Sequence, residues 1–184
     1  MDNIEIQSLD SKYQEVKSYL EYYDIYGQPL VDEYAEELDA RVNAVKSYLN
    51  GVREYNVDFD VPSLQKIVID LSSTIYYTQD KFEKLNLLAD MSKIKYKDAY
   101  NAAYTSRQTA AKQEDRKYTG EQLRAIAEQE TLEENLINFI YTRASSVLKG
   151  KIDAAYELLK ACSKSLSAEI QSMQTYNVSN KYHI

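Results

Sequence analysis

The chain has 184 residues, of which 44% are hydrophobic, and this is enough for one domain of ordinary size or one elongated helical unit. Four glycines and two prolines are few for this length, and a β-sandwich or an α/β fold needs many turns that these residues supply. The composition therefore excludes such folds and predicts an all-α protein.

The single cysteine, Cys162, cannot form an internal disulfide or a cysteine metal site. The first residues, MDNIEIQSLDSKY, lack the basic and apolar regions of a secretory signal peptide. No apolar run approaches the roughly 20 residues that span a bilayer. We therefore expect a soluble protein with no membrane partner, located in the cytoplasm, or in the host cytoplasm if a phage encodes it.

Residues 1–62 are expected to form an acidic helical hairpin followed by a connector. Tyrosines and aliphatic residues recur at helical spacing in residues 8–26, and aliphatic residues do so again in residues 30–54. Gly27 and Pro29 lie between the two segments and are expected to separate them.

A long helical hairpin is expected over residues 63–176. Residues 55–63, YNVDFDVPS, predict an extended connector, with Ser63 as the cap of the following helix. Apolar residues then recur at steps of three and four over residues 63–113. Small residues replace the large ones in the second half of this helix, which favours close contact between helices.

The second long helix of the hairpin is expected over residues 120–175. Thr119, with Gln122 three residues later, predicts a capping box at its start. Gly150 lies inside this helix, where it either weakens the helix by about 1 kcal/mol relative to alanine or acts as a hinge. Residues 177–184 show no periodicity and are expected to be a frayed tail.

The fold class predicted from these elements is all-α: a long, coiled-coil-like antiparallel hairpin with an N-terminal helical pair. Long helices with narrow apolar seams leave apolar surface that one chain does not cover, so we expect a homo-oligomer. The candidate oligomerisation residues are Ile152, Leu159, Leu166 and Met173.

The formal net charge of −7 is unevenly distributed. Residues 1–90 carry 18 acidic and 8 basic residues, whereas residues 91–118 carry 7 basic and 3 acidic residues. On a helix, a stripe at steps of three and four is formed by Lys93, Lys97, Tyr100, Tyr104 and Arg107, and Lys112 extends its charge. Cations and flat aromatic rings together commonly hold single-stranded nucleic acid. The alternative is an exposed face whose lysines only keep the helix soluble.

The sequence does not predict an enzyme, a cofactor or a metal site. His183 is the only histidine and stands next to last, so no Ser/His/Asp or Cys/His catalytic set is present. The four glycines are scattered and form no phosphate-binding loop. Glu130, Glu133 and Glu134 are interpreted as a solvated helix face, and Cys162 as a small core residue.

Three consecutive features resemble the UvsY-type recombination mediators of T-even phages, over roughly residues 85–175. A basic, alanine-rich helix (YKDAYNAAYTSRQTAAK) is followed by a polar turn, and an acidic AEQETLEE helix leads into the amphipathic IDAAYELLKACSKSLSAEIQSM segment. The resemblance implies a homo-oligomer that binds single-stranded DNA and helps to load a RecA-like recombinase onto DNA coated by single-strand-binding protein. It implies DNA contacts in the stretch 93–112 and oligomerisation through the helix around residues 152–173.

Two other classes of function remain open. The chain could be a non-enzymatic structural protein of a phage particle, such as a helical connector or scaffold subunit. It could also be an inhibitor whose acidic N-terminal half mimics DNA and occupies a host or defence protein. The basic stripe favours the mediator, the acidic half favours the inhibitor, and the helical repeats fit all three.

Overall fold

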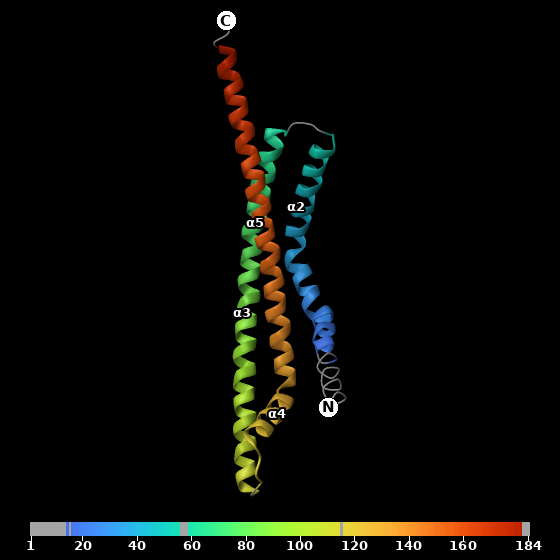
Figure 1. The fold of residues 1–184 in the computed structure, drawn as a ribbon, viewed down its shortest axis with the longest axis vertical. Helices are drawn as coiled ribbons and strands as arrows, with labels where there is room; N and C mark the ends of the chain where they lie inside the picture. Colours follow the sequence, from blue (N-terminus) through green and yellow to red (C-terminus); the bar gives the residue numbers. More distant parts are fainter. Residues whose placement is uncertain (1–13, 15, 56–58, 115, 182–184) are drawn as a thin grey trace, which may run out of the picture. The chain divides into compact units, whose positions relative to one another are not determined.

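The computed structural model describes residue 14 and residues 16–55, 59–114 and 116–181, and all regular secondary structure in these ranges is helical (Figure 1). The all-α prediction is therefore confirmed. The expected helix start at residue 8, residues 56–58 of the predicted connector and His183 lie outside the described residues.

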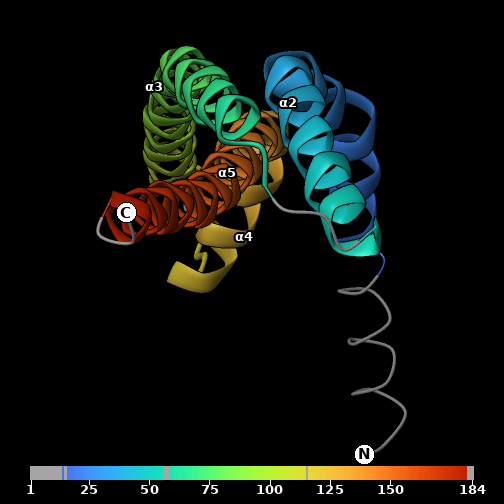
Figure 2. The same cartoon turned by 90° about the horizontal axis from the view of Figure 1, so that it is seen from above.

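A short π-helical segment and four α-helices follow one another along the chain. In order, they are η1 (Tyr23–Gly27), α2 (Gln28–Tyr55), α3 (Val61–Gln113), α4 (Gly120–Glu130) and α5 (Leu132–Lys181). The two long helices α3 and α5 lie side by side in both views (Figure 1 and Figure 2), which confirms the predicted hairpin.

The chain divides into two compact units. The first contains residues 1–31 and 83–147, and the second contains residues 32–82 and 148–184. The three boundaries fall inside α2, α3 and α5, so each unit contains its own part of α3 and its own part of α5.

Small side chains line much of the interior of the first unit. Ala89 of α3, Ala127 of α4 and Ala144 of α5 are all buried. Next to them, the Ser145 hydroxyl of α5 donates a hydrogen bond to Asn86 Oδ1 of α3 at 3.2 Å. Small residues let helix backbones approach closely. Close contact between helices was expected from the small residues in the second half of α3.

Larger aliphatic side chains fill the interior of the second unit. The buried residues include Leu38, Val45, Leu64, Leu71, Ile75, Leu148, Ile152 and Cys162. At the edge of this interior, Lys151 Nζ of α5 lies 2.5 Å from Asp39 Oδ2 of α2. Burial raises the pKa of the Cys162 thiol, and its 1% exposure confirms the prediction of a core cysteine.

The predicted break at Gly27 and Pro29 is wrong. The helix that contains residues 16–22 continues through η1 into α2, and the Gln28 N–H donates to the Tyr23 carbonyl, five residues earlier. A proline inside an α-helix lacks an N–H and clashes with the carbonyl four residues before it. A wider π turn directly before the proline relieves this clash, so one continuous helix replaces the expected N-terminal pair.

Three other predicted helix ends also differ from the structure. Asp60, rather than Ser63, caps α3, because its carboxylate accepts hydrogen bonds from the N–H and the hydroxyl of Ser63. The predicted helix over residues 120–175 is interrupted at Thr131, whose φ of −114° and ψ of 23° are not helical. The last helix then continues into the expected frayed tail and ends at Lys181.

The capping box predicted before α4 is confirmed. The Gln122 N–H donates to Thr119 Oγ1 at 3.2 Å, and the Thr119 N–H donates to Gln122 Oε1 at 2.9 Å. These reciprocal bonds satisfy two backbone donors that would otherwise lack partners, and α4 begins at Gly120.

Two helical glycines differ sharply in their surroundings. Gly27 is buried, and a Cβ added there would lie 2.4 Å from Tyr23 Cδ2 and 3.3 Å from Ile140 Cγ2. A Cβ added at Gly150 would meet no atom within 4 Å beyond its own stretch of helix. The α5 helix passes through Gly150 without interruption, so the structure shows no hinge there.

We expect Gly27→Ala to lower the stability of the protein and Gly150→Ala to raise it. The Cβ added by Gly27→Ala forces the buried Tyr23 ring to move, which costs about 1–3 kcal/mol and outweighs the gain in helix propensity. Gly150→Ala displaces no side chain and brings only the gain in helix propensity, about 1 kcal/mol. Urea unfolding followed by circular dichroism measures both changes. Equal stabilisation by the two substitutions would contradict the close packing around Gly27.

Candidate nucleic-acid interface and uncovered apolar surfaces

Three tyrosines one turn apart form a row along α3. The ring centroids of Tyr96 and Tyr100 are 6.3 Å apart, and those of Tyr100 and Tyr104 are 6.5 Å apart with an angle of 21° between the rings. Burial, the Glu128 carboxylate and Tyr100 all raise the pKa of the Tyr96 hydroxyl. Tyr96 is tilted by 57° from Tyr100, so the near-parallel pair of Tyr100 and Tyr104 offers the flat surface that base stacking uses.

The lysines beside this row are open to solvent. Lys93 and Lys97 are exposed, and among the described residues no carboxylate lies within ion-pair distance of either. Lys112 is also exposed and stands in the last turn of α3. Because it follows Arg107 by five residues, it does not lie on the same helix face. Lys112 therefore adds positive charge in the last turn of α3, beyond the stripe from Lys93 to Arg107.

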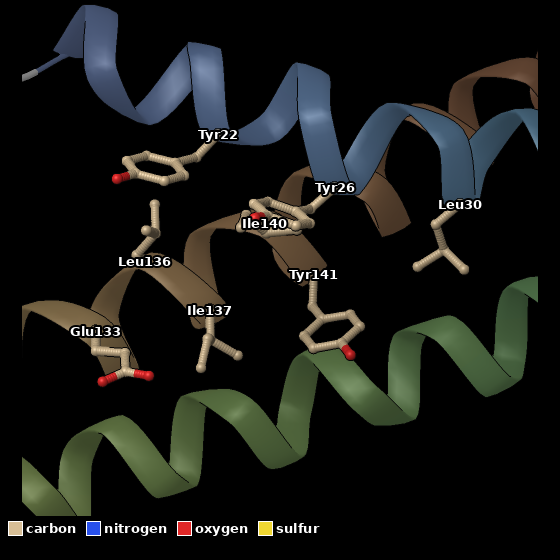
Figure 3. Close-up of a pocket in the computed structure, with 8 residues that line it drawn as sticks. All are labelled: Tyr22, Tyr26, Leu30, Glu133, Leu136, Ile137, Ile140 and Tyr141. Atoms are coloured by element: carbon tan, nitrogen blue, oxygen red, sulfur yellow. The ribbon is translucent and has the colours of Figure 1, made fainter.

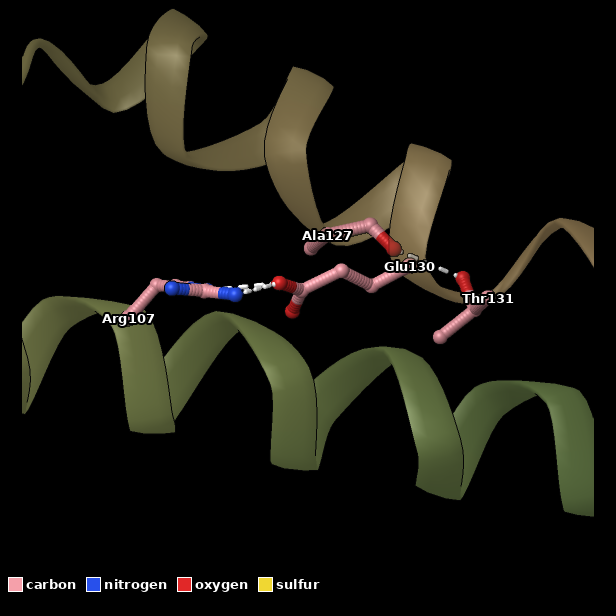
Figure 4. A network of polar contacts seen from close by, with 4 residues as sticks. All are labelled: Arg107, Ala127, Glu130 and Thr131. Atoms are coloured by element: carbon pink, nitrogen blue, oxygen red, sulfur yellow. Dashed lines mark hydrogen bonds and ion pairs between the residues drawn. The ribbon is translucent and has the colours of Figure 1, made fainter.

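The Arg107 side chain, predicted as a phosphate ligand, is already paired with a carboxylate. Its Nε donates to Glu130 Oε1 at 2.6 Å, and its Nη2 bonds the same oxygen (Figure 4). The hydrogen bond to Glu130, and then its charge, raises the pKa of Arg107. Glu130 is thus bound to α3 and is not a free member of a solvated acidic face.

This ion pair holds the end of α4 against α3. Glu130 is the last residue of α4, and the Thr131 hydroxyl donates to the Ala127 carbonyl at 2.8 Å where that helix ends (Figure 4). The same contact places the acidic residues of α4 close to the basic stripe, as the influence of Glu128 on the pKa of Tyr96 also indicates. The positive field of the stripe is therefore partly neutralised from within the first unit.

The four candidate oligomerisation residues occupy different environments in the second unit. Ile152 is 2% exposed and belongs to the interior of that unit, so it is not a surface residue. Leu159 and Leu166 are partly exposed, and Met173 is 51% exposed. Figure 1 shows that the end of α5 extends beyond the ends of α2 and α3 that the connector joins. Of the four residues, only Leu159, Leu166 and Met173 have exposed surface available to a partner.

An apolar groove of about 580 Å³ lies in the first unit between the helix that contains η1 and the start of α5 (Figure 3). Its lining residues are Tyr22, Tyr26, Leu30, Glu133, Leu136, Ile137, Ile140 and Tyr141. The Tyr22 and Tyr26 rings are stacked with centroids 6.5 Å apart. Sequence reasoning missed this groove, although Tyr22, Tyr26 and Leu30 recur at steps of four.

A second apolar surface, which we name the back stripe, consists of Leu87, Leu88, Met91 and Ile94 of α3. These side chains are 60%, 38%, 48% and 59% exposed, respectively. Sequence reasoning missed this surface as well. The steps of four and three from Leu87 to Met91 and Ile94 are its signal, because they place these residues on one helix face.

Comparison with family models, curated proteins and solved structures finds no match for this chain. Among the described residues, no helix is both long enough and apolar enough to cross a membrane. In the same part of the chain, no group of three or more His, Cys, Asp or Glu side chains is placed to hold a metal ion.

Proposed function

We propose that the protein is a non-enzymatic, phage-type accessory protein that binds single-stranded DNA as a homo-oligomer and assists the loading of a RecA-like recombinase. The observation that carries the proposal is the pair of near-parallel rings of Tyr100 and Tyr104 on the same helix as the exposed Lys93 and Lys97. The two proposed protein partners, a RecA-like recombinase and a single-strand-binding protein, are inferred from the resemblance to UvsY-type mediators.

The chemistry of this surface favours weak binding without sequence preference. Each base stacked on an aromatic ring contributes about 1–3 kcal/mol and tolerates any base. Affinity falls as salt rises, and we call the slope of log affinity against log salt concentration the salt slope. Each neutralised phosphate of a single strand adds about 0.7 to its magnitude. Two exposed lysines therefore predict a slope of about 1.4 per subunit. Several subunits on one strand would strengthen binding through their combined contacts, so the homo-oligomer is part of the proposal.

Lysine and tyrosine substitutions should affect DNA binding in different ways. Lys93→Ala with Lys97→Ala should lower both the affinity for oligo-dT and its salt slope, because two phosphate contacts are lost. Tyr100→Leu with Tyr104→Leu should lower the affinity and leave the slope nearly unchanged, because stacking releases few ions. Fluorescence anisotropy of labelled oligo-dT over a salt series measures both quantities.

The matched control is Lys46→Ala with Lys149→Ala, which removes the same charge from exposed positions outside the stripe. This control should bind almost as wild type does. The proposal fails if wild type does not bind oligo-dT at low salt, or if the stripe variants bind as tightly as the control.

Glu130→Gln should increase the affinity for oligo-dT. The substitution removes the charge that holds Arg107 and leaves its guanidinium for a phosphate, which should raise the salt slope by up to about 0.7. Glu121→Gln is the control, because it removes one charge from an exposed position of the same helix without freeing an arginine. An equal effect of the two substitutions would show that Arg107 is not part of the interface.

The homo-oligomer should depend on the end of α5. Leu166→Lys with Met173→Lys should lower the mass of the assembly, because two charges enter a partly exposed apolar row. Gln171→Lys with Gln174→Lys, at exposed polar positions of the same helix, is the control and should keep the assembly intact. Sedimentation equilibrium at micromolar concentration measures the masses, and a wild-type mass near 21.3 kDa would contradict the proposal.

A structural protein of a phage particle, such as a connector or scaffold subunit, is the second candidate. The uncovered groove and back stripe favour it, because contiguous apolar surface on a soluble protein marks interaction sites. This candidate predicts an assembly that forms without DNA and does not bind oligo-dT at any salt concentration.

A further inference from the structure

We infer that a second copy of the chain covers the back stripe, with the two α3 helices antiparallel and related by a twofold axis close to Met91. This inference deepens the homo-oligomer part of the proposed function and does not depend on DNA binding. All the residues that carry it belong to the first unit.

The back stripe is an apolar face with no covering element among the described residues. The α3 helix buries Leu85 and Ala89 on its inner side, yet Leu87, Met91 and Ile94 on the other side remain between 48% and 60% exposed. A surface helix of a monomer normally carries polar residues opposite its core face. A helix that is apolar on both sides therefore indicates a partner on the second side.

Two charged residues border the back stripe symmetrically and specify the partner. Lys84 precedes Met91 by seven residues and Asp98 follows it by seven, and residues seven apart lie on nearly the same helix face. Both are exposed, and neither has an ion-pair partner among the described residues. The face thus has a cation at one end and an anion at the other.

An antiparallel pair centred on Met91 satisfies these charges. Lys84 of each copy then lies opposite Asp98 of the other copy, and Leu88 lies opposite Ile94. Lys95 lies opposite Leu87, which its aliphatic stem can cover. A parallel pair in register would place like charges opposite each other and is disfavoured. The antiparallel contact is self-complementary, so it closes as a twofold dimer.

The dimer would leave the Lys/Tyr stripe accessible. Lys97 and Tyr100 follow Met91 by six and nine residues, which places them on the other half of the helix circumference. Each dimer would therefore present two stripes to solvent, and one strand of DNA long enough to reach both would be held by two sites.

Charge reversal in the full-length protein tests this inference. Lys84→Glu and Asp98→Lys, each alone, should weaken dimerisation several-fold to about tenfold, because each replaces two attractive pairs with two repulsive ones. The double variant restores opposite charges in both pairs and should dimerise as wild type does. The controls are Lys46→Glu and Glu121→Lys, which reverse exposed charges elsewhere and should have no effect. Sedimentation equilibrium over a concentration series measures each dissociation constant.

A cross-linking experiment provides a second, independent measurement. In a Cys162→Ala background, Met91→Cys should be joined to its counterpart by a short bismaleimide, and Thr105→Cys should not. Unaffected single variants, a double variant that is not restored, or equal cross-linking at both positions would overturn the inference. An assembly that the α5 substitutions disrupt and the α3 substitutions do not would overturn it while leaving the proposed homo-oligomer intact. A wild type that is monomeric at every concentration would overturn both.

Discussion

The close packing of α3 against α5 is the interaction on which the other features of the protein depend. In the first unit, small buried residues such as Ala89 and Ala144 allow it, and the Ser145–Asn86 hydrogen bond lies beside them. In the second unit, aliphatic residues such as Leu71 and Leu148 supply a larger apolar interior. Because this packing uses one face of each helix, the remaining circumference of α3 is left for other contacts.

Within the first unit, that circumference carries two chemically different surfaces. One bears the exposed lysines and the row of tyrosines, and the other bears the apolar back stripe. The Arg107–Glu130 pair connects the first of these surfaces to α4. Both surfaces lie on the part of α3 that belongs to this unit, on different sides of the same helix.

Local sequence signals predicted the parts of the fold that local physics determines. The repeats of three and four residues predicted α3 and the burial of Cys162, and the Thr119–Gln122 pattern predicted the start of α4. The passage through Pro29 was missed because no simple spacing pattern encodes a π turn, and because the close surroundings of Gly27 include Ile140, which is distant in the chain. The Thr131 interruption was missed as well, since the adjacent Glu130 pairs with Arg107, a contact between residues far apart in the chain that local spacing does not show.

The candidate site was predictable only in part. Helical spacing correctly placed Tyr100 and Tyr104 one turn apart in a row. It could not show that Arg107 pairs with Glu130, which lies 23 residues later in the chain. Nor could it distinguish the buried Ile152 from the exposed Met173, because both have the same helical periodicity. Exposure of an apolar residue depends on which neighbouring helix reaches it, and that is a tertiary property.

The most direct test of the central claim is to locate the bound strand on the protein. Oligo-dT that contains 4-thiothymidine would be cross-linked to the full-length protein by light, and the modified peptides would be mapped by mass spectrometry. Our account predicts adducts in the α3 segment that contains Tyr100 and Tyr104, and their loss at high salt. Adducts confined to the groove residues or to the second unit, or a complete absence of adducts at low salt, would contradict it.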